Sequence, residues 1–190
     1  MSLPNKVTVF RIILIPVFMI FALPPASWYP GAFALFLENS GTILAIAVFI
    51  LAGITDIIDG NLARRRNEVS NLGKFLDPIA DKLLVLSALL VLIVRSDIST
   101  WIVMIIMARE FMVMGIRMVA AGEGVVVAAS IWGKIKTVTQ IVAIVAVLLS
   151  DMIDIWYLAD ILMGAAVLIT IYSGLDYLVK NIRFITKPGK

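Results

Sequence analysis

Residues Asp56–Asp81 read D-I-I-D-G-N-L-A-R-R-R-N-E-V-S-N-L-G-K-F-L-D-P-I-A-D, and this stretch places four aspartates between two long apolar runs. Asp56 and Asp59 are three residues apart, so on a helix they share one face, one turn from each other. Asp77 and Asp81 are four residues apart and share a face of the helix that follows. Two helices would therefore aim four carboxylates at one point, and such a cluster repels itself unless cations lie between the side chains.

The composition places this stretch in a membrane protein. Of the 190 residues, 62% are hydrophobic, and a helix that spans a bilayer needs roughly 20 apolar residues. The length therefore fits about six spans with short loops and leaves no room for a soluble domain. Because the chain has no Cys and no His, it has no disulfide, thiolate nucleophile, imidazole base or zinc site of the usual kind.

Six apolar stretches predict an all-α fold with six transmembrane helices. They cover residues 7–23, 42–59, 79–94, 101–120, 131–149 and 155–179. Because these stretches leave no room for a soluble domain, we expect residues 1–190 to form a single membrane domain.

The distribution of basic residues predicts how these helices are oriented. Every Lys and Arg except Arg95 falls at the termini or at the helix ends and loops of one side, while the loops of the other side are mostly acidic. Basic residues are retained on the cytoplasmic side of a membrane. Both termini are therefore predicted to be cytoplasmic, and Asp56–Asp81 is predicted to lie at the cytoplasmic face.

The aspartates could either cap helix ends, which is a structural role, or bind metal ions, which is a functional one. Asp56 and Asp59 could cap a helix end, but they come at the C-terminal end of the predicted helix, where the macrodipole disfavours acids. Asp77 precedes Pro78, which is the pattern of an N-cap followed by proline in the first turn. A charge in or near a spanning helix is costly and usually functional. Since oxygen-only ligands favour Mg²⁺ or Mn²⁺, the sequence predicts a metal site formed by Asp56, Asp59, Asp77 and Asp81.

Taken whole, the segment reads D-x2-D-G-x2-A-R-x8-G-x3-D-x3-D, and this pattern resembles the signature of the CDP-alcohol phosphotransferases. All eight defined positions are matched, by Asp56, Asp59, Gly60, Ala63, Arg64, Gly73, Asp77 and Asp81. The resemblance implies a six-helix membrane domain that binds two divalent ions and a CDP-linked lipid at the cytoplasmic face. It also implies transfer of the phosphatidyl group to an alcohol, with release of CMP.

The resemblance assigns roles to individual residues of the segment. Gly60, Ala63, Arg64 and Gly73 would bind the CDP-lipid, because small residues let the nucleotide approach the helix backbone and an arginine can bind a diphosphate in a bidentate manner. Bound metal ions would neutralise the charge that builds up on the phosphoryl oxygens and on the leaving CMP. Asp81 is implied to be the general base for the acceptor hydroxyl, or a further metal ligand without a proton role.

A second set of charges lies in the fourth and fifth apolar stretches. Arg109 and Arg117 are eight residues apart and roughly share a helix face, and Lys134 and Lys136 open the next helix. Four cations beside a metal–diphosphate site indicate an acceptor alcohol that itself carries a phosphate. Each cation could equally serve the cytoplasmic charge bias, but Arg109 lies deep in its apolar run, which favours binding.

Three further segments resemble one bacterial branch of the same family: L-P-N-K-V-T-V-F-R at residues 3–11, A-R-E-F-M-V-M-G-I-R at 108–117 and G-K-I-K-T-V-T-Q at 133–140. This resemblance implies CDP-diacylglycerol as donor, sn-glycerol 3-phosphate as acceptor, and phosphatidylglycerol phosphate plus CMP as products. Asn5, Thr8 and Arg11 either line the site or serve in helix capping and interface snorkelling. Inositol phosphate, phosphatidylglycerol and serine stay open as alternative acceptors.

The resemblance also implies a homodimer in a bacterial cytoplasmic membrane. A function of another class, a small cation transporter, would use the aspartates as an ion path. Transport sites usually lie near the bilayer midplane, between repeats with broken helices. Here the aspartates lie at one face and no repeat is visible, so the sequence favours an enzyme.

Overall fold

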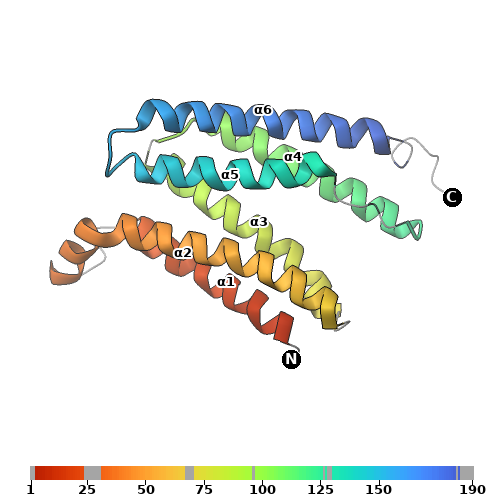
Figure 1. The fold of residues 1–190 in the computed structure, drawn as a ribbon, viewed down its shortest axis with the longest axis horizontal. Helices are drawn as coiled ribbons and strands as arrows, with labels where there is room; N and C mark the ends of the chain where they lie inside the picture. The colour runs from red at the N-terminus through yellow and green to blue at the C-terminus, as the bar shows by residue number, and fades with distance from the viewer. Residues whose placement is uncertain are drawn as a thin grey trace. The chain divides into compact units, whose positions relative to one another are not determined.

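A computed structural model describes residues 3–23, 31–66, 71–95, 97–125, 127, 130–182 and 184, without the side chains at positions 3, 4, 6, 56–66, 71–75 and 77. The described residues form helices and contain no β-strand, which confirms the all-α prediction. The six helices are α1 (Leu3–Ala22), α2 (Gly31–Arg66), α3 (Asn71–Val94), α4 (Thr100–Gly122), α5 (Ile131–Leu149) and α6 (Trp156–Asn181), shown in Figure 1.

Serine side chains begin two of these helices. The Ser99 hydroxyl accepts a hydrogen bond from the backbone N–H of Trp101 at 3.4 Å, and the Ser130 hydroxyl accepts one from the N–H of Gly133 at 3.0 Å. Both bonds satisfy N–H groups that the first turn of a helix leaves without a partner. As a result α4 and α5 begin within one residue of their predicted starts.

Both ends of α2 differ from the predicted stretch, residues 42–59. The helix begins at Gly31, because Glu38 and Asn39 interrupt the apolar pattern without ending the helix. The helix continues to Arg66 instead of ending at residue 59, so Asp56 and Asp59 lie inside it and not at its C-terminus. The apolar run does end near residue 59, but the next residues include leucine, alanine and three arginines, which have high helix propensity. The helix therefore outlasts the apolar pattern, and the macrodipole argument about these acids was wrong.

The start of α3 also differs from the prediction. The helix begins at Asn71, so Asp77 lies inside it and the N-cap interpretation of Asp77 is wrong. Pro78 lies within the helix as well. A proline there removes one hydrogen bond to the preceding turn, and helices of membrane proteins tolerate such interruptions.

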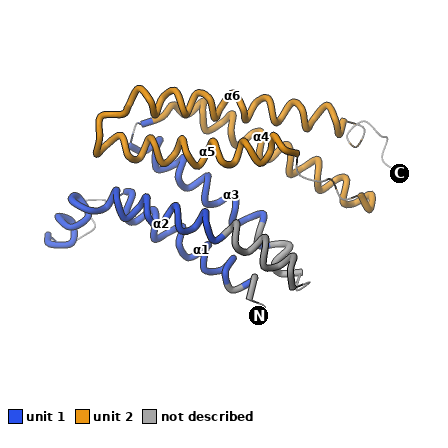
Figure 2. Tube along the Cα trace, in the orientation of Figure 1, with its two compact units in different colours: residues 1–97 blue, residues 98–190 orange. Residues whose placement is uncertain are grey.

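Residues 1–97 form one compact unit, in which α1 packs against both α2 and α3 (Figure 2). The rings of Phe18 on α1 and Phe49 on α2 lie 5.6 Å apart between centroids. At Gly41, α2 approaches α1 so closely that an added Cβ would lie 2.7 Å from the Phe21 carbonyl oxygen. Because α2 and α3 also contact each other, the two helices that carry the four aspartates belong to one packed group.

Residues 98–190 form a second compact unit, in which α6 packs against both α4 and α5. Its buried apolar residues include Ile106 and Val113 of α4, Ile144 of α5 and Met163 of α6. The two helices that carry the predicted basic site residues, α4 and α5, are therefore both supported by α6. That the whole chain is a single domain stays a prediction.

Within the described part of the chain, three helical segments are long and apolar enough to cross a membrane: Gly31–Thr55, Ile131–Leu149 and Trp156–Asn181. Helix α1 contributes a shorter apolar segment, Val7–Ala22. Large apolar side chains of α6 such as Leu168 and Leu175 are more than half exposed, as expected for contact with lipid. These features are those of a membrane protein. The six spans and the cytoplasmic location of the termini stay predictions.

Candidate active site

The acidic residues predicted for the site, termed the acidic half, belong to α2 and α3 of the first unit. Both pairs of aspartates lie within continuous helix, at spacings of three and four residues, so each pair shares a helix face as predicted. Seven predicted site residues have side chains outside the described part of the chain: Asp56, Asp59, Gly60, Ala63, Arg64, Gly73 and Asp77. Their assignment to metal ions and to a CDP-lipid stays a prediction.

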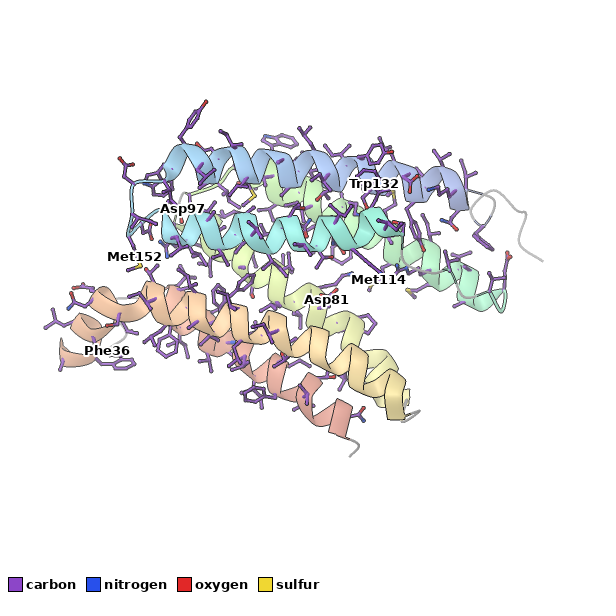
Figure 3. All side chains as sticks on the ribbon, in the orientation of Figure 1. Phe36, Asp81, Asp97, Met114, Trp132 and Met152 are labelled. Carbon is purple, nitrogen blue, oxygen red and sulfur yellow. The ribbon has the colours of Figure 1, made fainter. Side chains whose placement is uncertain are left out.

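Asp81 is a predicted catalytic residue whose side chain is described. It extends from α3 (Figure 3) with 46% of its side chain exposed, and its Oδ2 lies 3.8 Å from the Nζ of Lys82. That separation is an ion pair too long for a hydrogen bond. A partly exposed carboxylate of this kind can accept a proton from a substrate or bind a cation.

A polar face of α1 is buried beside the acidic half. Asn5, Thr8 and Arg11 follow one another at intervals of three residues and are at most 4% exposed. Because α1 packs against α2 and α3, this face is buried against the helices that carry the aspartates. Snorkelling does not explain Arg11, since its side chain is only 1% exposed, whereas Asn5 lies in the first turn of α1, where a role at the helix start stays a prediction. A buried guanidinium requires negative partners.

Two of the basic residues predicted for the site, which are termed the basic half, belong to a buried ion network within the second unit. One carboxylate oxygen of Glu110, Oε1, accepts hydrogen bonds from Arg109 Nη1 at 3.1 Å and from Lys136 Nζ. Arg109, Glu110 and Lys136 are 9%, 6% and 6% exposed. These three side chains carry two positive charges and one negative charge, so the trio has a net positive charge. A phosphate would offset that charge and offer further hydrogen-bond acceptors.

Helix α6 also contacts the Arg109 side chain, through Ser173 and Gly174. Arg109 Nη2 donates a hydrogen bond to Ser173 Oγ at 2.6 Å. At Gly174 the α6 backbone lies directly against the Arg109 side chain, where an added Cβ would come within 2.8 Å of Cγ. At Gly133, on α5, an added Cβ would lie 3.7 Å from Arg109 Nη2. The guanidinium is therefore located by groups from three helices.

The other two predicted cations lie outside this network. Arg117 is exposed, its Nε donates to Tyr177 Oη at 3.2 Å, and its guanidinium carbon lies 5.6 Å from the centroid of the Tyr177 ring. Lys134 is exposed as well. The structure thus joins Arg109 and Lys136 through Glu110 and leaves Arg117 and Lys134 at the surface. That all four bind one acceptor stays a prediction.

A second buried polar contact lies one turn further along α5. Gln140 Nε2 donates to Thr170 Oγ1 at 2.9 Å, and this hydroxyl donates to the Ala166 carbonyl oxygen at 2.6 Å. Gln140 follows Lys136 by four residues, and Thr170 precedes Ser173 by three. The polar interface between α5 and α6 therefore continues for a turn beyond the ion network.

Sequence reasoning missed the part that α6 plays. Ser173, Gly174 and Tyr177 fall in an apolar run that was predicted only as a membrane span. The available signal was the small, polar pair Ser-Gly inside that run, because small residues allow helices in a membrane to approach closely. Glu110 lies in the quoted segment 108–117 but was given no role, although its carboxylate accepts hydrogen bonds from both buried cations.

Comparison with known proteins gives concordant results over nearly the whole chain. Residues 1–172 match the family model described as CDP-alcohol phosphatidyltransferase. The chain is 46% identical to the CDP-diacylglycerol–glycerol-3-phosphate 3-phosphatidyltransferase of Bacillus subtilis, over 95% of each protein. It is 37% identical to the Escherichia coli protein of the same name, over 93% of each. A probable phosphatidylglycerophosphate synthase of Mycobacterium tuberculosis is 36% identical over 97% of this chain and 83% of that protein.

Proposed function

Because the chain belongs to the CDP-alcohol phosphatidyltransferase family, we infer that it is the enzyme that transfers the phosphatidyl group of CDP-diacylglycerol to sn-glycerol 3-phosphate. The products are phosphatidylglycerol phosphate and CMP, and the reaction belongs to phospholipid synthesis. The observation that carries this conclusion is the 46% identity, over 95% of both chains, to a protein named for this donor and acceptor.

We assign the donor to the acidic half. Four aspartates on two contacting helices supply only oxygen ligands, which fit Mg²⁺ or Mn²⁺ and not a softer metal. A pair of such ions, when bound, neutralises the charge of the donor diphosphate. Gly60, Ala63 and Gly73 leave room for the nucleotide beside the helix backbone, and Arg64 binds diphosphate oxygens.

We assign proton transfer to Asp81. In the reaction the acceptor hydroxyl oxygen bonds to the phosphorus that carries the diacylglycerol, and the bond from that phosphorus to CMP breaks. The hydroxyl must lose its proton as this happens. The partly exposed Asp81 carboxylate is suited to accept it, and the same side chain could also bind a metal ion.

We assign the phosphate of the acceptor to the basic half. The buried network of Arg109, Glu110 and Lys136 has a net positive charge, and this charge favours an acceptor that carries a phosphate over serine, which does not. Arg117 and Lys134 are exposed, so they can attract the anion from solution and add contacts to it. Inositol phosphate would satisfy the same charges, and relatives named for glycerol 3-phosphate favour that acceptor.

We further propose six membrane spans with both termini in the cytoplasm of a bacterium, and a homodimer as the assembled form. The charge distribution supports the orientation, since only Arg95 among the basic residues belongs to the opposite side. Trp101, Trp156 and Tyr157 lie at the starts of α4 and α6, on the side assigned to the exterior, as is common for aromatic residues at a membrane interface.

The test of this function is CMP release by the purified protein with CDP-diacylglycerol, Mg²⁺ and a panel of acceptors. We expect rapid release with glycerol 3-phosphate and little with serine, inositol phosphate or phosphatidylglycerol. Faster release with another acceptor would contradict the proposed substrate while keeping the family reaction. Cation flux into vesicles without any CMP release would support a transporter instead.

A further inference from the structure

We propose that Ser173 and Gly174 of α6 are positioning residues that set Arg109 for the phosphate of the acceptor. This inference rests on the proposed function, in which Arg109 binds that phosphate. It assigns a role in acceptor affinity to a helix on which the sequence analysis places no site residue. Neither residue needs to touch the substrate, because both act through the Arg109 side chain.

The first observation is the close approach at Gly174. An added Cβ would lie 2.8 Å from Arg109 Cγ, 3.4 Å from Met112 Cε and 3.7 Å from Arg109 Cβ. Real Cβ atoms do not come as near as the first of these distances, so alanine at this position would displace the Arg109 side chain. The absence of a side chain at Gly174 therefore determines where the Arg109 stem runs.

The second observation is the pattern of hydrogen bonds on the guanidinium. A guanidinium has five N–H donors, and among the described residues Arg109 uses Nη1 for Glu110 and Nη2 for Ser173. Its Nε is buried and has no hydrogen-bond partner there. Two fixed bonds orient the planar group, and the remaining donors stay available for an anion. Ser173 thus orients the guanidinium without consuming its capacity to bind phosphate.

The decisive experiment compares two glycine substitutions on the same helix. Gly174→Ala should raise the KM for glycerol 3-phosphate about tenfold, the loss expected when a charge-assisted hydrogen bond is misplaced, and change the KM for CDP-diacylglycerol less than about twofold. Gly164→Ala is the matched control, because nothing lies within 4 Å of an added Cβ there. Equal changes in both KM values for Gly174→Ala would overturn the proposal, since a general packing defect would affect both substrates.

A second variant tests the proposal without adding bulk between the helices, so that its effect cannot be attributed to a packing defect. Ser173→Ala removes only the hydroxyl that accepts from Arg109 Nη2, and we expect it to raise the KM for glycerol 3-phosphate about threefold or more. In an Arg109→Ala background, neither Ser173→Ala nor Gly174→Ala should raise that KM further, because the side chain through which both act is gone. If Ser173→Ala and Gly174→Ala raised this KM by the same factor with Arg109 present and with Arg109 replaced, they would not act through Arg109. That result would overturn the proposal.

Binding of inorganic phosphate separates this proposal from the proposed function. Phosphate should raise the unfolding temperature of the wild-type protein, and Gly174→Ala should need about tenfold more phosphate for the same shift. If the wild type shows this behaviour but does not turn over glycerol 3-phosphate, the proposed function fails and the positioning role stands. If phosphate stabilises both proteins at the same concentration, or neither, the positioning role fails.

Discussion

The predicted site residues of the two units differ in sign, aspartates in the first unit and buried cations in the second, and the two groups are distributed differently along the chain. In the first unit, four aspartates lie within the one stretch Asp56–Asp81, at helix spacings that can be read directly. In the second, the ion network joins α4, α5 and α6, and its hydrogen bond from Arg109 to Ser173 connects residues 64 apart. Residues on neighbouring helical turns can therefore be recognised as a sequence motif, whereas a group assembled from several helices can be recognised only once the fold is known.

The largest expected effect tests the acidic half. Asp59→Asn should lower turnover by about a thousandfold or more, because it removes one negative charge from a proposed two-metal site. The variant should fold normally, since the aspartates are proposed to bind ions and not to hold the helices together. CMP release and thermal unfolding of the same preparation would test both statements. Asp154→Asn, in an exposed loop, is the matched control.

A variant Asp59→Asn that retained near-normal activity would contradict the metal assignment. We propose that the aspartates of the first unit bind ions, whereas the ion network of the second unit stabilises the fold. A variant that lost activity and also failed to fold would contradict this difference, because the aspartates would then stabilise the fold as well.

The second prediction concerns the stability of the basic half. Glu110→Gln should lower the free energy of unfolding by about 3 kcal/mol, because it removes the carboxylate that accepts hydrogen bonds from two buried cations, Arg109 and Lys136. The double variant Glu110→Gln, Lys136→Met should recover part of that loss, since it also removes one of the two cations that the carboxylate paired. Unfolding in detergent would measure both, and a double variant less stable than the single one would contradict the account.

The third prediction compares Arg117 with the buried cations. Tyr177→Phe keeps the ring beneath the Arg117 guanidinium and removes only the hydroxyl that accepts from Nε. We expect the KM for glycerol 3-phosphate to rise about threefold at most, because an exposed arginine with one bond fewer can still reach an anion. A rise in this KM as large as that from Gly174→Ala would contradict the prediction, because it would mean that Arg117 contributes as much as Arg109 to the binding of glycerol 3-phosphate.

The smallest effect concerns an acid outside both halves. Burial raises the pKa of Asp97 above its ordinary value of 3.8, against the opposing effect of Arg95, whose Nε donates to its carboxylate at 3.0 Å. The folded protein then binds this proton more tightly than the unfolded chain does, so its stability falls as pH rises through the window above 3.8. Thermal unfolding should be measured for wild type and for Asp97→Asn across this pH window. The decrease in stability with rising pH that Asp97 causes should appear in wild type and be absent from Asp97→Asn. A fall of the same size in the Asp97→Asn variant would assign it to another group.

Much of the fold followed from apolar runs, because a helix in a membrane protein must be apolar over most of its length. The bounds of α5 agree with the predicted run, since Ser130 caps its start and polar residues follow its end. The predicted bounds were wrong at the start of α2, which begins at Gly31 and not at residue 42, at the end of α2 and at the start of α3. Polar and charged residues there interrupt the hydrophobic pattern without interrupting the helix.

The candidate site was predicted to a different extent in each unit. The aspartates were recognised because their spacing and type have few structural explanations in a membrane helix. Arg109 and Lys136 were recognised as cations, but not as partners of one carboxylate, because the contact of Glu110 with both depends on how α4 and α5 are placed by α6. Gly174 gave only the weak signal of a small residue inside an apolar run, since its effect comes from the side chain it lacks.

The most direct test of the account measures CMP formed from CDP-diacylglycerol by the purified protein, with and without Mg²⁺ and with and without glycerol 3-phosphate. The account predicts CMP only when both are present, in equal amount with phosphatidylglycerol phosphate, and none after the divalent ion is removed by a chelator. CMP formed at the same rate without glycerol 3-phosphate, or with the divalent ion removed, would contradict it.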